Sequence, residues 1–551
     1  MLLGRPTGGV FLEKRIVNIY VLLLVCITGV LVRLAVLTTG DSLAAAARDQ
    51  SSYVMDVGES RGYFYDRNFK PLVNRQERIA LAVAPTPLAV EALREVLPQD
   101  QFEDSLAILQ NQKPMVIPTG TLPLAQAEGM LAFQLPVRYQ QHQLAAHLLG
   151  YTDASGKGVS GLEKGYDQQL AQWGGRIQVR YLVSATGRTI SEEAQEVRDT
   201  LTQARGGVVL TLDREIQQVA EDAMEQVPRG ACVVMKAGTG EILALVSRPT
   251  FDIYNLSAAL DSPDSPFFNR ALGAYSVGSG FKIAMAAAAL EAGYSPDYTY
   301  TCTGSYQLGE QVYHCNRRMG HGTLTMTEAI EQSCNPYFIN LGQRLGAQAV
   351  YQMAYNLGFG SATRLGEGVF SAAGSLLPPE QVSPGELANL SFGQGRLTAT
   401  PVQMAQMLSI VAGGGMWVSP TVVLGTTEDG AVLTPVPEQP PQKRVMTRAT
   451  ALQLQEMLVG AVDQGSGRNA KPQVGSAGGK TSTAQTGSYQ EDKEIVHAWF
   501  CGFFPGDEPQ YTVVVFAEGG GEGGVLPAKV FRQISQEIQY RALRRTQPFV
   551  E

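Results

Sequence analysis

A serine and a lysine three residues apart form the first group that could do chemistry. Ser279 and Lys282 lie in AYSVGSGFKIAMAAAALEAG, residues 274–293, where a glycine-rich turn precedes a run of strong helix formers. Residues three apart share a helix face, so the amine of Lys282, when neutral, can take the proton of the Ser279 hydroxyl. The positive end of the helix dipole also favours a neutral amine and negative charge on the oxygen. This pair predicts a serine nucleophile with its own base.

Two polar elements later in the chain could complete an acyl-transfer site. Ser333 and Asn335 flank Cys334 in the only Ser-x-Asn of the chain, and Lys480 begins its only Lys-Thr. Acyl transfer needs a base, a proton for the departing amine and donors for the oxyanion. We expect Ser333 to relay the proton, the Asn335 amide to hold a peptide, and Lys480 to attract a terminal carboxylate.

The oxyanion should lie between two backbone N–H groups, those of Ser279 and Thr483. Thr483 follows Lys480 on the same expected edge strand, where Thr481 and Ser482 would line the substrate. The competing interpretation makes the two motif serines helix caps and Lys282 a surface lysine, although capping and catalysis can coexist.

Composition excludes several other classes of protein. A net charge of -8 and a pI near 5.4, without a Lys/Arg run, argue against nucleic acid as a partner. Hydrophobic residues at 44% exclude a mainly disordered chain. The six cysteines include no Cys-x-x-Cys and the histidines no His-Glu-x-x-His, so neither a metal nor a cofactor is predicted. We expect His321 and His497 to be hydrogen-bonded core or groove residues.

The N-terminal segment is long and apolar enough to cross a membrane. Residues 16–37 contain a single charge, and a span needs roughly 17 to 25 residues. Three basic residues precede this stretch, which favours a cytoplasmic stub over 1–15 and an extracytoplasmic body. A cleaved signal peptide is the alternative, because small residues at 43–47 could be cut. The length of the apolar stretch favours a retained anchor.

A domain boundary is expected near residue 205, and the elements that could position the motifs follow it. A glycine-containing turn there leads into a strand and then into a helix over 214–227. Another helix is expected over 529–543. Strand-like apolar runs occur at 231–237, 241–247, 496–504 and 511–518. Strands thus recur at both ends of an alanine-rich helical middle, which predicts an α+β fold with an antiparallel sheet covered by helices.

These features together resemble a known family. The order Ser-x-x-Lys, Ser-x-Asn, Lys-Thr is that of penicillin-binding proteins and class A β-lactamases. Segments 61–73 and 158–170 are similar to the Arg-Gly-x-x-x-Asp-Arg and Gly-Leu-Glu motifs of a non-catalytic pedestal, and 230–252 and 391–405 resemble stretches of a transpeptidase domain. The chain after residue 15 therefore resembles a class B penicillin-binding protein, a monofunctional peptidoglycan D,D-transpeptidase.

The resemblance implies an architecture. It predicts an elongated mixed pedestal, or dimerisation, domain over 38–205 and a transpeptidase domain over 206–551. The latter should hold an antiparallel five-stranded sheet covered by helices, plus a helical subdomain. C-terminal extension modules of some Gram-positive relatives are expected to be absent. Structural ion pairs are expected at Arg61, Asp66, Arg67 and Glu163.

The resemblance also implies a reaction and its partners. The enzyme would attack the penultimate D-alanine carbonyl of a stem peptide, release the terminal D-alanine and pass the acyl group to an amine, and β-lactams would acylate Ser279. Expected partners are peptidoglycan stem peptides, lipid-linked precursor polymer and a membrane glycosyltransferase, in elongation, division or sporulation. The alternatives are a D,D-carboxypeptidase or β-lactamase, and a non-enzymatic scaffold or β-lactam sensor.

Two features depart from or add to the family pattern. Ser482 stands where the family usually has glycine, so we expect it to narrow the groove or alter β-lactam affinity. Cys334 and Cys315 could form a redox-sensitive disulfide in an oxidising exterior, which would stabilise by roughly 3 kcal/mol but tie up the Ser-x-Asn element. Cys302 with Cys315 is a competing pair, and free buried thiols are the alternative to both.

Overall fold

The computed structural model describes residues 9–39, 52–122, 127–184, 186, 188–189, 196–436, 440–490, 492–521 and 524–546. The chain divides into two compact units. The first comprises 1–59, 77–135 and 175–203, and the second comprises 60–76, 136–174 and 204–551. The second unit thus takes in two segments that the sequence assigns to the pedestal. The domain limits of 38–205 and 206–551 stay predictions.

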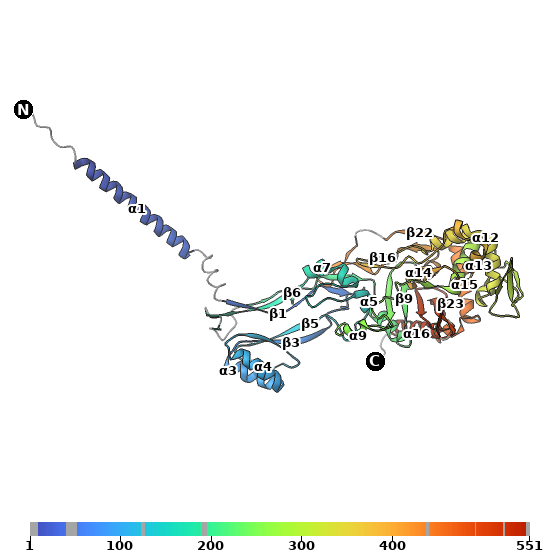
Figure 1. Ribbon diagram of the computed structural model, residues 1–551, viewed down its shortest axis with the longest axis horizontal. Coiled ribbons are helices and arrows are strands. Elements are labelled where there is room, and N and C mark those ends of the chain that lie inside the picture. Colours follow the sequence, from blue (N-terminus) through green and yellow to red (C-terminus); the bar gives the residue numbers. More distant parts are fainter. Residues whose placement is uncertain are drawn as a thin grey trace, which may run out of the picture. The chain divides into compact units, whose positions relative to one another are not determined.

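The N-terminal helix α1 spans Gly9–Thr39 (Figure 1). Its portion Glu13–Thr38 is long and apolar enough to cross a membrane, and none of its most apolar stretch is buried. An apolar side chain left in water costs free energy, whereas hydrocarbon accepts it. The expected single span over 16–37 is therefore matched by a helix. The small residues at 43–47 that could mark a cleavage site lie outside the described residues.

The described residues of the rest of the first unit form two three-stranded sheets and two helices. The strand orders are β1-β6-β7 and β4-β3-β5. Helix α3 begins at a Thr86 cap whose hydroxyl accepts from the Ala89 N–H, with a proline at its first turn. The elements are β1 Ser52–Ser60, β3 Gln76–Val83, α3 Pro87–Val96, α4 Gln99–Leu109, β4 Met115–Thr119, β5 Met130–Val137, β6 Gly175–Leu182 and β7 Glu196–Asp199.

The second unit is built on a five-stranded sheet with strand order β10-β9-β25-β24-β23, in which every neighbouring pair is antiparallel. The strands are β9 Gly230–Lys236, β10 Ile242–Arg248, β23 Gly478–Gln490, β24 Lys493–Phe504 and β25 Tyr511–Ala517. The strands expected at 231–237, 241–247, 496–504 and 511–518 are confirmed, and so is the α+β fold class with its five-stranded antiparallel sheet.

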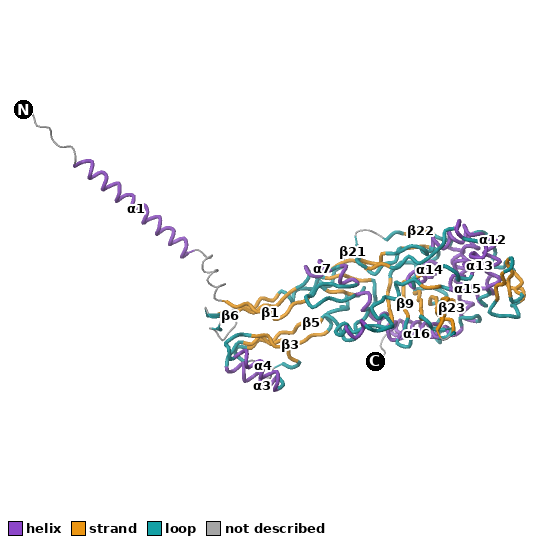
Figure 2. Tube along the Cα trace, viewed as in Figure 1, coloured by secondary structure: helices purple, strands orange, loops and turns teal. Residues whose placement is uncertain are grey.

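Both faces of this sheet are covered, because alternate side chains of a strand point to opposite faces. On one face, Val234 and Phe500 pack with residues of α8 (Arg214–Met224) and α16 (Leu526–Thr546). On the other, Val233 and Trp499 pack with α14 (Pro401–Ala412) and α10 (Lys282–Glu291). Figure 2 draws α14 and α16 as purple helices beside the orange strands β9 and β23. The sheet is thus the central layer, and β23 is its edge strand.

The helical part of this unit lies between β10 and β23 in the chain and supplies most of the motif residues. Its helices are α10, α11 Met326–Glu331, α12 Asn335–Asn356, α13 Pro384–Ser391, α14 and α15 Arg448–Asp463. Capping boxes fix the starts of α11, α13 and α14, each with a Ser or Thr cap and a Glu or Gln three residues later. Short helices are α5 Ala146–Leu149, α6 Gly161–Gly165, α7 Asp167–Gln172, α9 Ser257–Leu260, η1 Gly278–Phe281, η2 Pro379–Gln381 and η3 Arg468–Ala470.

Small sheets complete the second unit. One has the order β2-β8-β20-β21, and the others are two-stranded. Their strands are β2 Tyr63–Tyr65, β8 Gly207–Leu210, β11 Tyr275–Ser276, β12 Tyr300–Cys302, β13 Ser305–Leu308, β14 Gln311–His314, β15 Gly322–Leu324, β16 Arg364–Gly366, β17 Val369–Phe370, β18 Thr398–Ala399, β19 Met416–Val418, β20 Val423–Thr427, β21 Thr434–Pro435 and β22 Gln442–Arg444.

Three of the four expected ion-pair residues form such pairs within this unit. Arg61 pairs with Glu163 at 3.6 Å, and Arg67 with Glu241 at 3.1 Å. The expectation for Asp66 is wrong, because its buried carboxylate instead accepts backbone N–H groups, including that of Arg214 at the start of α8. A carboxylate at a helix N-terminus is stabilised by the free N–H groups there.

Candidate active site

Ser279 lies in the short 3₁₀ helix η1, directly before α10. Gly278, which precedes it, has φ +61° and leaves no room for a side chain, since a Cβ there would lie 2.4 Å from the Thr483 carbonyl oxygen. The glycine-rich turn expected from the sequence therefore allows η1 to approach the edge strand β23 closely. Ser279 itself is partly exposed. The nucleophile candidate thus stands at the start of a helix and beside the sheet edge.

Lys282 is fully buried and joins the first motif to the second. Its Nζ donates to Asn335 Oδ1 at 2.6 Å, to the Ser333 carbonyl at 2.8 Å and to Ser333 Oγ at 3.1 Å. Ser333 has φ +56°, an unfavourable conformation for a residue with a side chain. The turn between α11 and α12 therefore holds a strained backbone that aims two of these oxygens at the lysine.

The Ser279 hydroxyl forms no hydrogen bond in the part of the chain that the structure describes. The sequence predicts that Lys282 lies beside Ser279, and the two are one helical turn apart along η1 and α10. The hydrogen bonds that the Lys282 amine makes with described residues nevertheless all go to Ser333 and Asn335 of the Ser-x-Asn element. Catalytic hydrogen bonds often tighten only when substrate is bound, so this arrangement is compatible with a nucleophile and its base.

Burial controls the charge of both motif lysines. It lowers the pKa of Lys282 well below its usual value, and the nearby positive charge of Lys480 lowers it further. Burial also lowers the pKa of Lys480, to about 7. Neither amine forms an ion pair with a described carboxylate. A buried amine without a counter-ion is readily held neutral near neutral pH, which is the state that a general base requires.

The third motif lies on the edge strand β23. Lys480 is fully buried, and its Nζ donates to the Thr481 carbonyl at 3.1 Å and to Ser466 Oγ at 3.4 Å. The Thr481 hydroxyl donates to the same Ser466 oxygen at 3.2 Å. An edge strand can pair with an added peptide through its backbone, and Thr483 is exposed on it. Ser466, in a turn after α15, carries no motif and is missed by the sequence analysis.

Ser482 occupies an unexpected place. Its side chain is 1% exposed, and its Oγ donates to the Val277 carbonyl at 2.6 Å and accepts from the Gly280 N–H at 3.0 Å. The Ser482 side chain therefore does not point into the groove that it was expected to narrow, and an effect of Ser482 on β-lactam affinity stays a prediction. Residues two apart on a strand share a face, so Ser482 follows Lys480 inward and packs against η1. Its hydroxyl bridges the residues on either side of the Gly278-Ser279 pair.

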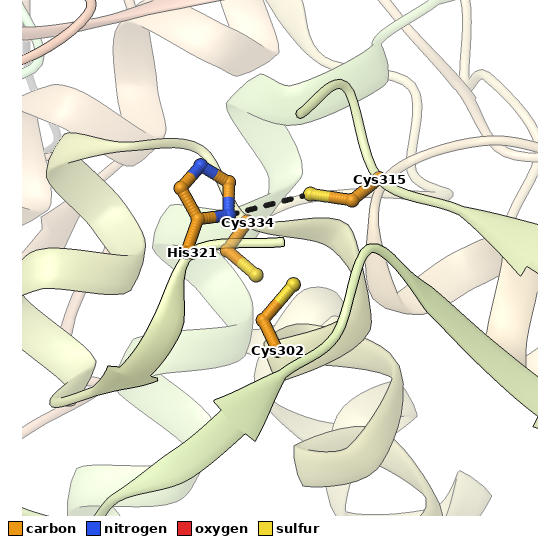
Figure 3. Close-up of side chains that lie close together, drawn as sticks. All are labelled: Cys302, Cys315, His321 and Cys334. Atoms are coloured by element: carbon orange, nitrogen blue, oxygen red, sulfur yellow. Dashed lines mark hydrogen bonds between the residues drawn. The ribbon is translucent and has the colours of Figure 1, made fainter. Parts of the chain in front are cut away.

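The cysteine pair proposed from the sequence belongs to a larger cluster. Cys315 and Cys334 are both free thiols in the structure, and Cys302 and His321 lie beside them (Figure 3). The disulfide between Cys315 and Cys334 stays a prediction. A four-residue cluster could not be predicted, because its members come from separate segments without a zinc-type spacing.

This fold and this site define a serine acyltransferase, and comparison with known proteins identifies the family. A family described as "Penicillin binding protein transpeptidase domain" matches residues 230–536. The chain belongs to the penicillin-binding protein transpeptidase family and, within it, to the class B proteins.

Relatives and solved structures agree with this assignment. Stage V sporulation protein D of Bacillus subtilis is 30% identical over 90% of this chain and 81% of the relative. The peptidoglycan D,D-transpeptidase MrdA of Acinetobacter baumannii is 27% identical over 88% of this chain and 81% of the relative. A chain from a peptidoglycan synthase complex superposes with a TM-score of 0.70 at 26% identity, covering 98% of this chain and 99% of that one. Penicillin-binding protein 3 of Mycobacterium tuberculosis, complexed with aztreonam, superposes with a TM-score of 0.63 at 26% identity, covering 89% of this chain and 97% of that one.

Proposed function

We propose that the chain is a peptidoglycan D,D-transpeptidase that works through an acyl-enzyme on Ser279. The observation that carries the proposal is the buried Lys282, whose amine contacts Ser333 and Asn335 and whose residue follows Ser279 by one helical turn. Relatives that span most of the chain are named peptidoglycan D,D-transpeptidases. The proposed substrate is a stem peptide that ends in D-alanyl-D-alanine.

In the acylation step, neutral Lys282 takes the proton of the Ser279 hydroxyl as Oγ attacks the penultimate D-alanine carbonyl. The C–O bond forms, and the oxyanion accepts from the backbone N–H groups of Ser279 and Thr483. Ser333 then relays the proton to the departing nitrogen, the C–N bond breaks and D-alanine leaves. The hydrogen bond from Lys282 Nζ to Ser333 Oγ at 3.1 Å supports this relay.

In the second step, an acceptor amine attacks the ester carbonyl. The new C–N bond forms, the C–O bond to Ser279 breaks, and the proton lost by the amine returns to the serine oxygen through the same groups. Asn335 holds the peptide and Lys480 attracts its carboxylate, while Thr481 lines the same edge strand. We propose that β-lactams imitate the substrate amide and stop at the first step. One related protein, penicillin-binding protein 3 of Mycobacterium tuberculosis, forms complexes with aztreonam and with ampicillin.

The setting proposed for this reaction is the outer face of the cell membrane. The apolar helix α1 is compatible with one span, with the N-terminal stub over 1–15 inside and the catalytic unit outside. A membrane glycosyltransferase that supplies lipid-linked precursor polymer is the proposed partner. Two related structures come from assemblies, a peptidoglycan synthase complex and a complex of Helicobacter pylori PBP2 with MreC.

Labelling with a fluorescent penicillin tests the proposal. Full-length protein in detergent should gain one label, and the label should map to the peptide that carries Ser279. Ser279→Ala should take up none, whereas Ser488→Ala, an exposed serine on β23, should label like wild type. Product analysis with a stem peptide and an acceptor amine should then yield the cross-linked dimer. Release of free acid alone would identify a carboxypeptidase. An absence of acylation would favour a non-enzymatic scaffold.

A further inference from the structure

A buried carboxylate that has no role in the proposed reaction lies close to the Ser-x-Asn element. Glu331 is the last residue of α11, two residues before Ser333, and it is 6% exposed. In the described part of the chain its side chain has no cationic partner, and only Gln464 hydrogen-bonds it. Burying a carboxylate costs free energy unless hydrogen bonds replace its lost hydration. The contacts of Glu331 therefore show which part of the molecule it holds.

Glu331 hydrogen-bonds the turn that follows α15 in two ways. Gln464 Nε2 donates to Glu331 Oε1 at 3.1 Å, and the Ser466 N–H donates to the Glu331 carbonyl at 2.9 Å. The side chain and the main chain of a single residue therefore fix two residues of one turn. We call residues 464–467 the Ser466 turn.

Two glycines make room for this contact. A Cβ on Gly460 would lie 2.2 Å from Glu331 Oε1, and a Cβ on Gly465 would lie 2.6 Å from the Glu331 carbonyl oxygen. Neither glycine has a φ in the left-handed region, so what each supplies is space and not an unusual backbone conformation. The close approach of Glu331 to the end of α15 thus depends on residues of both segments.

The Ser466 turn carries a hydroxyl to the third motif. Lys480 Nζ donates to Ser466 Oγ at 3.4 Å, and the Thr481 hydroxyl donates to the same oxygen at 3.2 Å. Ser466 is exposed, whereas Lys480 is fully buried. The hydroxyl of a surface residue therefore contacts the buried amine that is proposed to attract the substrate.

Ser466 is one of two described acceptors for the Lys480 amine, and the Thr481 carbonyl at 3.1 Å is the other. A protonated amine has three donors, so one remains for a substrate carboxylate. The lysine stem is long and flexible, and the amine keeps one orientation only where its acceptors are fixed. The position of Ser466 therefore helps to set the direction of the remaining donor.

Glu331 is also joined to the second motif through the main chain. It ends α11, and the Ser333 N–H donates to the Ile330 carbonyl of that helix at 3.3 Å. Ser333 in turn accepts from Lys282 Nζ. Glu331 thus stands between the turn that contacts the Lys282 amine and the turn that contacts the Lys480 amine.

We propose that Glu331 is a positioning residue, which holds the Ser466 turn so that Ser466 aims the Lys480 amine at the terminal carboxylate of the substrate. This role rests on the proposed function, in which Lys480 attracts that carboxylate. Glu331 hydrogen-bonds no motif side chain among the described residues, so it acts through Ser466. A misplaced Lys480 amine should slow acylation by ligands that carry a carboxylate and should not slow acylation by ligands that lack one.

Two ligands that differ only in the carboxylate, penicillin G and its methyl ester, test this role. The second-order rate constant of acylation is measured with each for the full-length protein in detergent. Ser466→Ala and Gln464→Ala should lower the penicillin constant about 3- to 10-fold, as expected for the loss of one hydrogen bond, and should change the ester constant by less than about 2-fold. Both variants replace exposed residues, so the fold should persist.

Conservative variants separate positioning from packing. Ser466→Thr keeps the hydroxyl, and Glu331→Gln keeps an oxygen that can accept from Gln464, so both should retain at least about half of the penicillin constant. Glu331→Met removes that acceptor and should lose as much as Gln464→Ala. Matched controls are Gln473→Ala and Ser488→Ala, exposed residues outside the Ser466 turn, which should react like wild type with both ligands.

Three results would each overturn the positioning role. They are wild-type penicillin constants in Ser466→Ala and Gln464→Ala, equal losses with penicillin and with the ester, and no recovery in Ser466→Thr. In all three cases wild type still forms the acyl-enzyme, so the proposed function stands. A wild type that neither ligand acylates would instead reject the proposed function, and the role of Glu331 with it.

Discussion

Ser482 Oγ accepts a hydrogen bond from the Gly280 N–H at 3.0 Å and so fastens the edge strand β23 to the residue that follows the proposed nucleophile, Ser279. The same hydroxyl donates to the Val277 carbonyl at 2.6 Å. The turn that presents Ser279 is thus held by a side chain at a position where the family usually has glycine. We infer from this contact that Ser482 positions Ser279, the proposed nucleophile.

Replacing Ser482 with glycine should destabilise the turn. Ser482→Gly leaves the Gly280 N–H and the Val277 carbonyl buried without these partners, at a cost of about 1 to 3 kcal/mol. We expect a lower Tm and slower acylation by penicillin, about 3- to 10-fold, since a misplaced nucleophile is costly. Ser488→Gly, an exposed change on the same strand, is the control. Equal Tm and equal acylation rate in the two variants would contradict the positioning role.

Removing the amine of Lys282 should abolish the base while keeping the helix. In Lys282→Gln we expect acylation to slow by at least about 100-fold, the usual contribution of a general base. Stopped-flow labelling measures this rate, and circular dichroism checks that the fold persists. Lys529→Gln, on the exposed face of α16, should acylate at the wild-type rate. If Lys282→Gln acylates within a factor of two of wild type, another group serves as the base.

The pH dependence of acylation should report the charge of Lys480. Burial and the Lys480 charge both lower the pKa of Lys282, so removal of that charge lets the Lys282 pKa rise. Lys282 then becomes neutral only at higher pH. The acid limb of the acylation profile should accordingly move to higher pH in Lys480→Met, whatever the change in maximum rate. Lys529→Met should leave the limb in place, and a shift of the Lys480 variant to lower pH would refute the coupling.

Parts of the site could be read from the sequence and parts could not. The motif residues could be predicted because their types, order and uniqueness reflect the chemistry itself. The inward direction of the Ser482 side chain could not be predicted, since it depends on the contact between β23 and the turn at Gly280, which lies 202 residues earlier in the chain. The cysteine and histidine cluster was missed for a similar reason. Its side chains meet only because tight turns at Gly304 and Gly320 interlock, and no local spacing records that.

The buried carboxylate of Glu163 should be a major source of stability in the second unit. Glu163 is fully buried, and its Oε1 accepts from Arg138 and from the Tyr139 hydroxyl at 2.9 Å, while Oε2 lies 3.6 Å from Arg61. Glu163→Ala leaves Arg138, whose side chain is only 13% exposed, without its ion-pair partner and with only its hydrogen bond to the Gly62 carbonyl, which costs about 3 kcal/mol.

Thermal or urea unfolding measures this loss, and the pair Arg541–Glu537 on α16 supplies the control. Glu537→Ala breaks an exposed pair and should cost under about 1 kcal/mol. Because Glu163 contacts none of the proposed catalytic groups, the folded fraction of Glu163→Ala should acylate with penicillin at close to the wild-type rate. A stability equal to that of Glu537→Ala would show that water or other groups compensate Arg138, and a specific loss of acylation would tie this ion pair to the active site instead.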